Sequence, residues 1–437
     1  MKYIENKNLL KYRFSNGMLM LPFFRYEIMC NLNKKKSEKK QTPLRKKQRK
    51  NYLSLLLNLR KNVIYEKDIV FFTSTDFNVK DEQGNYYNNL DGYYYNLCKD
   101  DALLVEDSNN LFEWKKTKRY TTISYFKTYL IFLSSIFAKF YAKLHLGKHE
   151  MLNAFGTETG INILNLKYSQ GFVISLAYLY RIILKKIKPS KIFVNCGSYG
   201  MDYAILIKCA HELGIRVIEL QHGAIDDGHL AYHVDDFIAN NIEYQEYLPD
   251  ELWLFGEYWA NSIEWKYKKK VVGNPHLNSQ IKKIKKSNEG YDYMVIAQPE
   301  VESIIIKFVD SLAKKYPKDK ILLRLHPRDI LENYQSKLKD YVNIEYSNST
   351  SPLYEEISKS YYIVGAYSTC LYEALALQKN PIIVDCNLSR RHFPKNIGYW
   401  VKDADSIDQE KLKQNEVINT EYYWAVNFED NVRKYMY

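Results

Sequence analysis

Residues suited to proton transfer are concentrated in one short segment of the chain. Four of them fall within eight positions: His222, Asp226, Asp227 and His229. They follow an apolar run at 216–220 that is typical of a buried strand. Imidazole and carboxylate groups can take a proton from a hydroxyl, so we expect His222, Asp226 or Asp227 to act as a general base. The alternative is a polar loop in which these side chains only cap neighbouring elements.

A second set of residues is suited to binding phosphate. His326 and Arg328 follow an apolar run at 320–325, and a guanidinium group presents a planar set of donors that matches a phosphate. Ser368 and Thr369 open a predicted helix, where hydroxyls and free backbone N–H groups can hold an anion. We expect these four residues to bind a donor phosphate. The alternatives are a simple turn at His326 and a simple helix cap at Ser368.

Two further residues frame the segment that contains Ser368. Gly365 permits a tight turn from a strand into the helix, because glycine lacks a side chain. Glu373 lies one turn into the helix, where a carboxylate can accept hydrogen bonds from ribose hydroxyls. We therefore include Gly365 and Glu373 in the expected donor site, although a glutamate on a helix is equally a surface charge.

Elements that would position these residues are clearest between 293 and 385. Apolar runs bounded by turn residues predict strands at 293–297, 320–325, 342–346, 361–364 and 381–385. Helical segments separate them, and such alternation predicts a parallel sheet with helices on both faces. A strand–helix–strand unit at 191–220 predicts the same class in the first half of the chain.

The length of 437 residues indicates more than one domain. We expect a basic, mainly helical segment at 1–60, a Rossmann-like acceptor domain at 61–277 and a Rossmann-like donor domain at 290–437. A charged linker at 278–289 would join them, and the last helix would pack back on the first domain. Because ligands bind at the carboxyl ends of strands in such sheets, the two sets of polar residues would face each other across a cleft.

Three motifs resemble those of one group of enzymes. Arg324-Leu325-His326-Pro327-Arg328, followed by Tyr367-Ser368-Thr369, resembles the HP and S-S/S-T motifs of bacterial sialyltransferases and related capsule-building transferases with the GT-B fold. Asp226-Asp227-Gly228 resembles their acidic motif. Leu220-Gln221-His222-Gly223 is similar to a Q-H-G element of capsule and lipopolysaccharide glycosyltransferases. The resemblance covers about residues 190 to 390, and the acidic and Q-H-G motifs compete for one loop.

The resemblance implies a GT-B fold and inverting transfer of an acidic sugar, such as sialic acid or Kdo, from a CMP donor without a metal or other cofactor. Asp226 or Asp227 would deprotonate the acceptor hydroxyl, with His222 as the rival base. His326 would stabilise the departing phosphate, and Ser368 and Thr369 would hold it. The partners implied are a nucleotide sugar and a glycan or lipid-linked glycan acceptor of the bacterial surface.

Charge is concentrated in one segment. The formal net charge is +12, and Lys34–Lys50 alone carries ten basic residues and one acidic residue. A local basic segment favours an anionic membrane surface over a nucleic acid, with a solvated charged segment as the alternative. The six cysteines have no metal-type spacing, and no signal peptide is recognisable, so we expect a cytoplasmic protein attached peripherally to the inner face of the plasma membrane.

Three other functions stay open on the sequence. Similar HP and S-T features occur in CDP-alditol polyol-phosphate transferases, which catalyse phosphoryl transfer. A non-catalytic, glycan-binding GT-B scaffold and a sugar-nucleotide epimerase would share the same architecture. The sequence has no P-loop and no dinucleotide-binding glycine motif, so nucleotide hydrolysis and Rossmann-type redox chemistry lack support.

Overall fold

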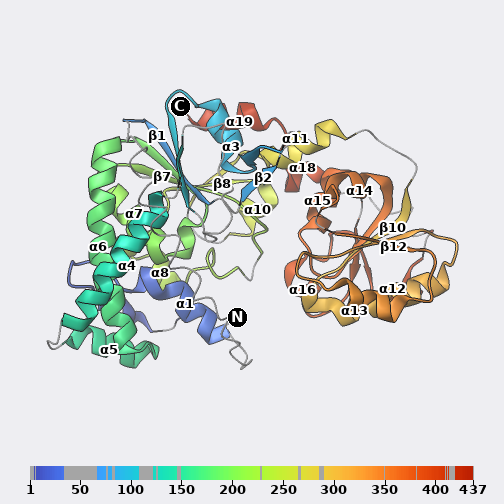
Figure 1. The fold of residues 1–437 in the computed structure, drawn as a ribbon, viewed down its shortest axis with the longest axis horizontal. Coiled ribbons are helices and arrows are strands. Elements are labelled where there is room, and N and C mark those ends of the chain that lie inside the picture. The colour runs from blue at the N-terminus through green and yellow to red at the C-terminus, as the bar shows by residue number, and fades with distance from the viewer. Residues whose placement is uncertain are drawn as a thin grey trace.

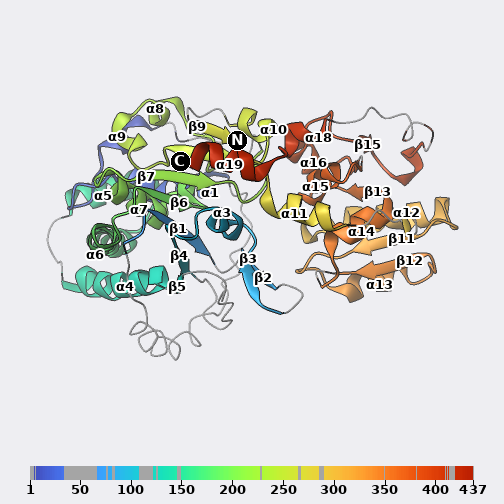
Figure 2. The same cartoon turned by 90° about the horizontal axis from the view of Figure 1, so that it is seen from above.

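The structure is a computed structural model. It describes residues 4, 6–33, 66–74, 77–80, 84–107, 122–124, 126–144, 149–226, 229–263, 267–284, 290–348, 350–379, 381–408, 410, 412 and 419–436. The basic segment Lys34–Lys50 and Asp227 lie outside the described residues. Two α/β domains lie side by side along the longest axis of the molecule (Figures 1 and 2).

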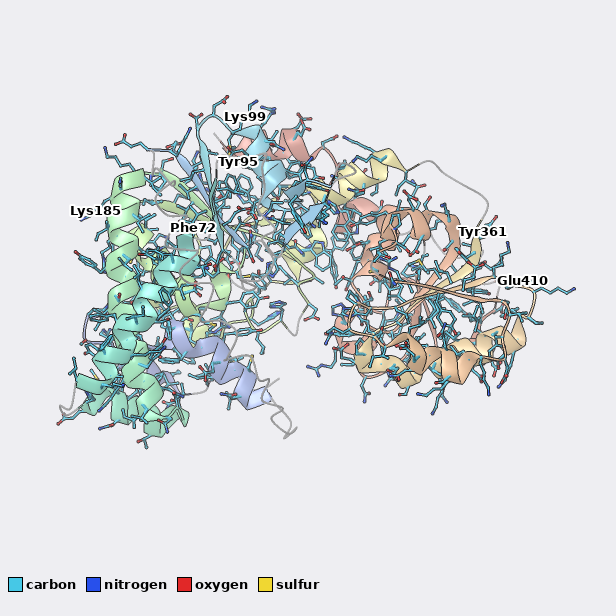
Figure 3. All side chains as sticks on the ribbon, in the orientation of Figure 1. Phe72, Tyr95, Lys99, Lys185, Tyr361 and Glu410 are labelled. Carbon is cyan, nitrogen blue, oxygen red and sulfur yellow. The ribbon has the colours of Figure 1, made fainter. Side chains whose placement is uncertain are left out.

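The N-terminal domain is built on a seven-stranded sheet in the order β5-β4-β1-β6-β7-β8-β9. Every neighbouring pair in this sheet is parallel. Its strands are β1 (Ile69–Ser74), β4 (Ala102–Asp107), β5 (Thr122–Ser124), β6 (Lys191–Val194), β7 (Arg216–Leu220), β8 (Glu251–Leu254) and β9 (Lys268–Val271). The central strands are apolar on both faces because helices cover both sides, and Figure 3 shows Phe72 of β1 and Tyr95 inside this domain.

Helices and one hairpin complete this domain. The described helices are α1 (Leu21–Asn33), α3 (Asp91–Leu97), α4 (Phe126–Leu144), α5 (Glu150–Thr159), α6 (Ile163–Ile187), α7 (Met201–His211), α8 (Asp236–Ala239), α9 (Ile242–Gln245), α10 (Glu257–Asn261) and α11 (Pro275–Lys283). Strands β2 (Asn78–Lys80) and β3 (Tyr86–Asn88) form an antiparallel hairpin. Helix α1 is not a detached surface helix, because Leu21, Phe24 and Met29 are buried in the domain core.

The C-terminal domain contains a six-stranded parallel sheet in the order β12-β11-β10-β13-β14-β15. Its strands are β10 (Tyr291–Ile296), β11 (Ile321–Arg324), β12 (Ile344–Ser347), β13 (Ser360–Gly365), β14 (Pro381–Val384) and β15 (Tyr399–Val401). Its helices are α12 (Glu302–Lys315), α13 (Leu331–Leu338), α14 (Leu353–Lys359), α15 (Cys370–Ala376) and α16 (Ser389–His392). Helices α12 and α13 pack on one face of this sheet, and α14 and α15 pack on the other.

The end of the chain returns to the N-terminal domain. Helix α18 (Thr420–Tyr423) packs on α10 and α15, and α19 (Phe428–Met436) packs on α3. The rings of Tyr94 and Phe428 lie 4.9 Å apart in an edge-to-face arrangement. Among the described helices, none is long and apolar enough to cross a membrane.

The predicted α/β fold, with two Rossmann-like domains facing each other in the GT-B arrangement, is confirmed. Every strand predicted between 293 and 385 is present. The first half of the predicted linker at 278–289 is helical, because Asn274 caps a helix that begins at Pro275 and continues to Lys283. Strands β5 and β15 were not expected.

Candidate functional site

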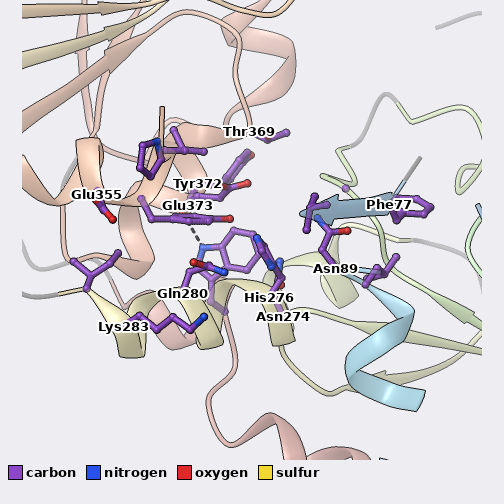
Figure 4. Close-up of a pocket in the computed structure, with 18 of the residues that line it drawn as sticks. Phe77, Asn89, Asn274, His276, Gln280, Lys283, Glu355, Thr369, Tyr372 and Glu373 are labelled. Carbon is purple, nitrogen blue, oxygen red and sulfur yellow. Dashed lines mark hydrogen bonds between the residues drawn. The ribbon is translucent and has the colours of Figure 1, made fainter. Parts of the chain in front are cut away.

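A cavity of about 1050 Å³ lies between the two domains. The N-terminal domain contributes the β2–β3 hairpin, the loop after β7 and helix α11, and the C-terminal domain contributes α14 and α15. Figure 4 shows Thr369 and Glu373 on one side, Phe77 and Asn89 on the other, and α11 between them. Space of this size is typical of a site for a small organic ligand.

His222 is the predicted base that lines this cavity. The side chain of Gln221 fixes the turn after β7, because it accepts the N–H of Phe255 and donates to the carbonyl of Gly223, each at 2.8 Å. Burial lowers the pKa of His222 below its usual value. Its Nδ1 atom has no hydrogen-bond partner among the described residues. The side chain is therefore a neutral imidazole at neutral pH, and its Nδ1 atom is buried.

Asp226 is engaged in a contact between the domains. One carboxylate oxygen lies 2.8 Å from Nδ1 of His392, which ends α16 in the C-terminal domain. The backbone carbonyl of Asp226 also lies 3.0 Å from Nε2 of His233. His229 also has a hydrogen-bond partner, because its Nε2 lies 3.0 Å from the hydroxyl of Tyr199. Burial lowers the pKa of His229 to about 4. Of the predicted acid–base cluster, His222 alone among the described members lines the cavity.

Two of the predicted donor-site residues line the opposite wall. Thr369 and Glu373 reach the cavity from the start of α15. Burial raises the pKa of Glu373 to about 7, although a hydrogen bond with the hydroxyl of Tyr354 lowers it. The Oε2 atom of Glu373 has no partner among the described residues. This carboxyl group is therefore poised to donate or to accept a hydrogen bond near neutral pH.

The other predicted donor-site residues do not line the cavity in the described part of the chain. Ser368 is buried, and its hydroxyl accepts the N–H of Cys370 at 3.3 Å, as a helix cap does. Gly365 ends β13, where a Cβ atom would lie 3.3 Å from a methyl group of Leu371. Both residues shape the turn that presents Thr369.

His326 and Arg328 form a turn of their own. Nδ1 of His326 accepts the backbone N–H of Arg328 at 3.1 Å. The guanidinium group of Arg328 forms an ion pair with Glu300 at 2.7 Å and is largely exposed. Arg324, two residues before His326, does line the cavity, where it pairs with Glu356 and donates to the carbonyl of Ser351 at 3.1 Å.

Helix α11 supplies residues that sequence reasoning missed. His276, Gln280 and Lys283 follow a spacing of four and three positions, so they share one helix face, and they line the cavity (Figure 4). The His276 ring packs between Tyr93 of one domain and Tyr354 of the other, at 6.3 and 5.9 Å. Burial and nearby Lys283 lower the pKa of His276 to about 4. The helical spacing after the Asn274-Pro275 start signal could have revealed this face.

Within the described residues, no group of three or more His, Cys, Asp or Glu side chains is arranged to hold a metal ion. The charged groups on the cavity wall are mainly basic. Lys80, Lys283, Lys359 and Arg324 line it, against Glu355 and the partly protonated Glu373. The cavity therefore favours an anionic ligand.

No protein-family model matches the chain, and no curated protein matches it in sequence. Solved structures do match. UDP-GlcNAc 2-epimerase from Methanocaldococcus jannaschii is 13% identical, with a TM-score of 0.44 over 84% of this chain and 98% of that chain. The Neisseria meningitidis enzyme bound to UDP-GlcNAc is 13% identical, with a TM-score of 0.46 over 84% and 99%. A spinosyn rhamnosyltransferase is 10% identical, with a TM-score of 0.40 over 83% and 96%. Such distant likeness assigns no activity to this chain.

Proposed function

We propose that the protein is a glycosyltransferase that takes a sugar from a nucleotide donor in the cavity between its domains. One observation carries the proposal: the cavity has the neutral imidazole of His222 in one wall and the polar start of α15, with Thr369 and Glu373, in another. A proton acceptor from one domain and polar groups from the other suit the transfer of a group between two bound substrates.

The proposed reaction is inverting. The imidazole of His222 accepts the proton of an acceptor hydroxyl, whose oxygen forms a bond to the anomeric carbon of the donor sugar. The bond between that carbon and the phosphate oxygen breaks, and its electron pair leaves with the nucleotide. The hydroxyl of Thr369 and the protonated carboxyl of Glu373 would donate hydrogen bonds to the departing phosphate, and Lys283 would balance its charge. His222 replaces Asp226 as the base that we favour, because Asp226 is paired with His392.

The donor that we favour carries an acidic sugar on CMP. The basic wall of Lys80, Lys283 and Lys359 supports an anionic donor, and the resemblance of the S-T motif, whose Thr369 lines the cavity, favours the CMP type. The acceptor would be a glycan of the bacterial surface, and Lys34–Lys50 would hold the enzyme at an anionic membrane.

The first test is a thermal-shift series with CMP, CDP, UMP, UDP, GDP and TDP. A ligand at a hundred times its Kd raises the free energy of unfolding by about 2.7 kcal/mol. We expect CMP to raise the Tm and Thr369→Val, which removes a donor hydroxyl, to reduce that shift. Arg328→Ala is the matched control, because Arg328 lies outside the cavity lining. If Arg328→Ala abolishes the shift while Thr369→Val does not, the donor binds at the His326 turn instead.

Product analysis then separates the reaction classes. A glycosyltransferase gives free nucleotide and a glycosylated acceptor. A CDP-alditol transferase gives CMP and a phosphodiester, and an epimerase gives an isomerised sugar nucleotide without any acceptor. A purified protein that binds no nucleotide and converts none of these donors would be a non-catalytic scaffold, and our proposal would be wrong.

A further inference from the structure

One helix of the N-terminal domain carries an apolar face that is largely exposed among the described residues. On α4, the side chains of Ile136, Phe137, Phe140 and Leu144 are 37%, 44%, 62% and 75% exposed. Their spacing places them along one side of the helix. The opposite side is buried and includes Lys127, Ser134 and Ala138. Figures 1 and 2 place α4 on the outside of the N-terminal domain, away from the C-terminal domain.

The inner face of α4 is already fully packed. Gly171 of α6 allows the two helices to approach closely, since a Cβ atom at this position would lie only 2.7 Å from Cβ of Tyr141. Gln170 of α6 also donates to the hydroxyl of Tyr141 at 2.8 Å. Phe140 and Leu144 are the most exposed members of the row, and an exposed row of large apolar residues indicates a binding surface.

The exposed charged residues of α4 are basic. This helix contains no aspartate or glutamate, and two of its three lysines, Lys139 and Lys143, are exposed, whereas Lys127 is buried and pairs with Asp107 and Asp202. Lys139 and Lys143 are exposed on the flank of the apolar row. A lysine in this position can lay its apolar stem along a membrane interface and keep its ammonium group among the lipid headgroups.

We propose that the outer face of α4 docks on an anionic lipid bilayer, with the helix lying along the membrane surface. Apolar side chains would enter the boundary between headgroups and acyl chains, and Lys139 and Lys143 would contact lipid phosphates. A second copy of the chain fits this face less well, because two identical basic surfaces repel each other across a twofold axis. The inference concerns the N-terminal domain alone and does not depend on the proposed reaction.

The test is co-sedimentation of the full chain with vesicles of phosphatidylglycerol and phosphatidylcholine, and with vesicles of phosphatidylcholine alone. We expect binding to the anionic vesicles, and a loss of roughly tenfold or more in the double variant Phe137→Ser/Phe140→Ser and in Lys139→Glu/Lys143→Glu. The matched controls are Ile242→Ser/Val342→Ser, which removes still more exposed apolar residues elsewhere, and Lys318→Glu/Lys395→Glu, which makes the same change of charge. Both controls should bind as the unchanged protein does.

A second measurement reports how deeply the outer face of α4 enters the bilayer. A tryptophan introduced by Phe140→Trp should be quenched by lipids brominated on their acyl chains, and one introduced by Ile242→Trp should not. The proposal is overturned if both α4 variants bind normally while neutralising Lys34–Lys50 abolishes binding. It is also overturned if Phe137→Ser/Phe140→Ser dissociates a dimer in sedimentation equilibrium without any change in vesicle binding.

Discussion

The contact between Asp226 and His392 should hold the two domains together. The carboxylate and Nδ1 lie 2.8 Å apart, and the two side chains are 24% and 10% exposed. Exposed ion pairs contribute about 0.2–1 kcal/mol, whereas a hydrogen bond to a charged group contributes about 1.5–3 kcal/mol. For this half-buried pair we expect a coupling free energy of about 1.4 kcal/mol, which corresponds to a tenfold change in the ratio of closed to open domains.

A double-mutant cycle with Asp226→Ala, His392→Ala and both together isolates this coupling, because it cancels the contact that the His392 ring makes with Tyr367. The readout is the efficiency of energy transfer between fluorophores at positions 185 and 361, which are exposed on different domains (Figure 3). Each single variant should lower the transfer efficiency, and the double variant should lower it no further.

The matched control for this cycle is the Arg328–Glu300 ion pair, which has a similar distance of 2.7 Å but lies within the C-terminal domain. Removing it should leave the transfer efficiency unchanged. Additive effects of Asp226→Ala and His392→Ala, or an equal effect of the control pair, would refute the reasoning that this contact bridges the domains.

Three further predictions concern the proposed base, a buried carboxyl group and a close backbone contact. Replacing the proposed base by His222→Gln should reduce kcat by about 10²–10⁴-fold, and the unchanged enzyme should lose kcat/KM only below pH 6.5, because burial lowers the pKa of His222 and the neutral form is active. Glu219 is buried with its pKa raised from 4.5 to about 7, so the folded state binds the extra proton. The free energy of unfolding should therefore fall as pH rises from about 4.5 to about 7, and a urea titration of Glu219→Gln should show a shallower fall. Gly256→Ala should lower the urea midpoint, since its Cβ would lie 2.3 Å from the carbonyl oxygen of Tyr423, whereas Gly223→Ala meets no atom within 4 Å and should be neutral.

Sequence patterns predicted the sheet of the C-terminal domain well because its strands are short, buried on both faces and separated by helices. Edge strands were harder to predict. Strand β15 at Tyr399–Val401 contains only three residues, two of them half-buried, so it lacks the apolar run that identifies an inner strand.

The site was predicted less completely than the fold. The rule that ligand-binding residues follow the ends of strands identified His222 and Thr369, because both follow strands that end near the cavity. The same rule missed His276, because this residue lies on a helix between the domains. It also could not foresee the contacts of Arg328 with Glu300 and of Asp226 with His392, since these partners are 28 and 166 positions away in the chain. Pairing between distant residues depends on tertiary structure, which local patterns do not contain.

The interface between the domains is apolar around Tyr372, and this limits how the cavity can open. The Tyr372 ring lies 4.9 Å from that of Trp259, its hydroxyl donates to the carbonyl of His392 at 2.8 Å, and its own carbonyl accepts the indole N–H of Trp424 at 2.7 Å. Exposing this aromatic cluster to water would cost far more than breaking one ion pair. The domains should therefore rotate about Tyr372 rather than separate. A ligand would then enter where the wall is polar, beside Gln280 and Lys283.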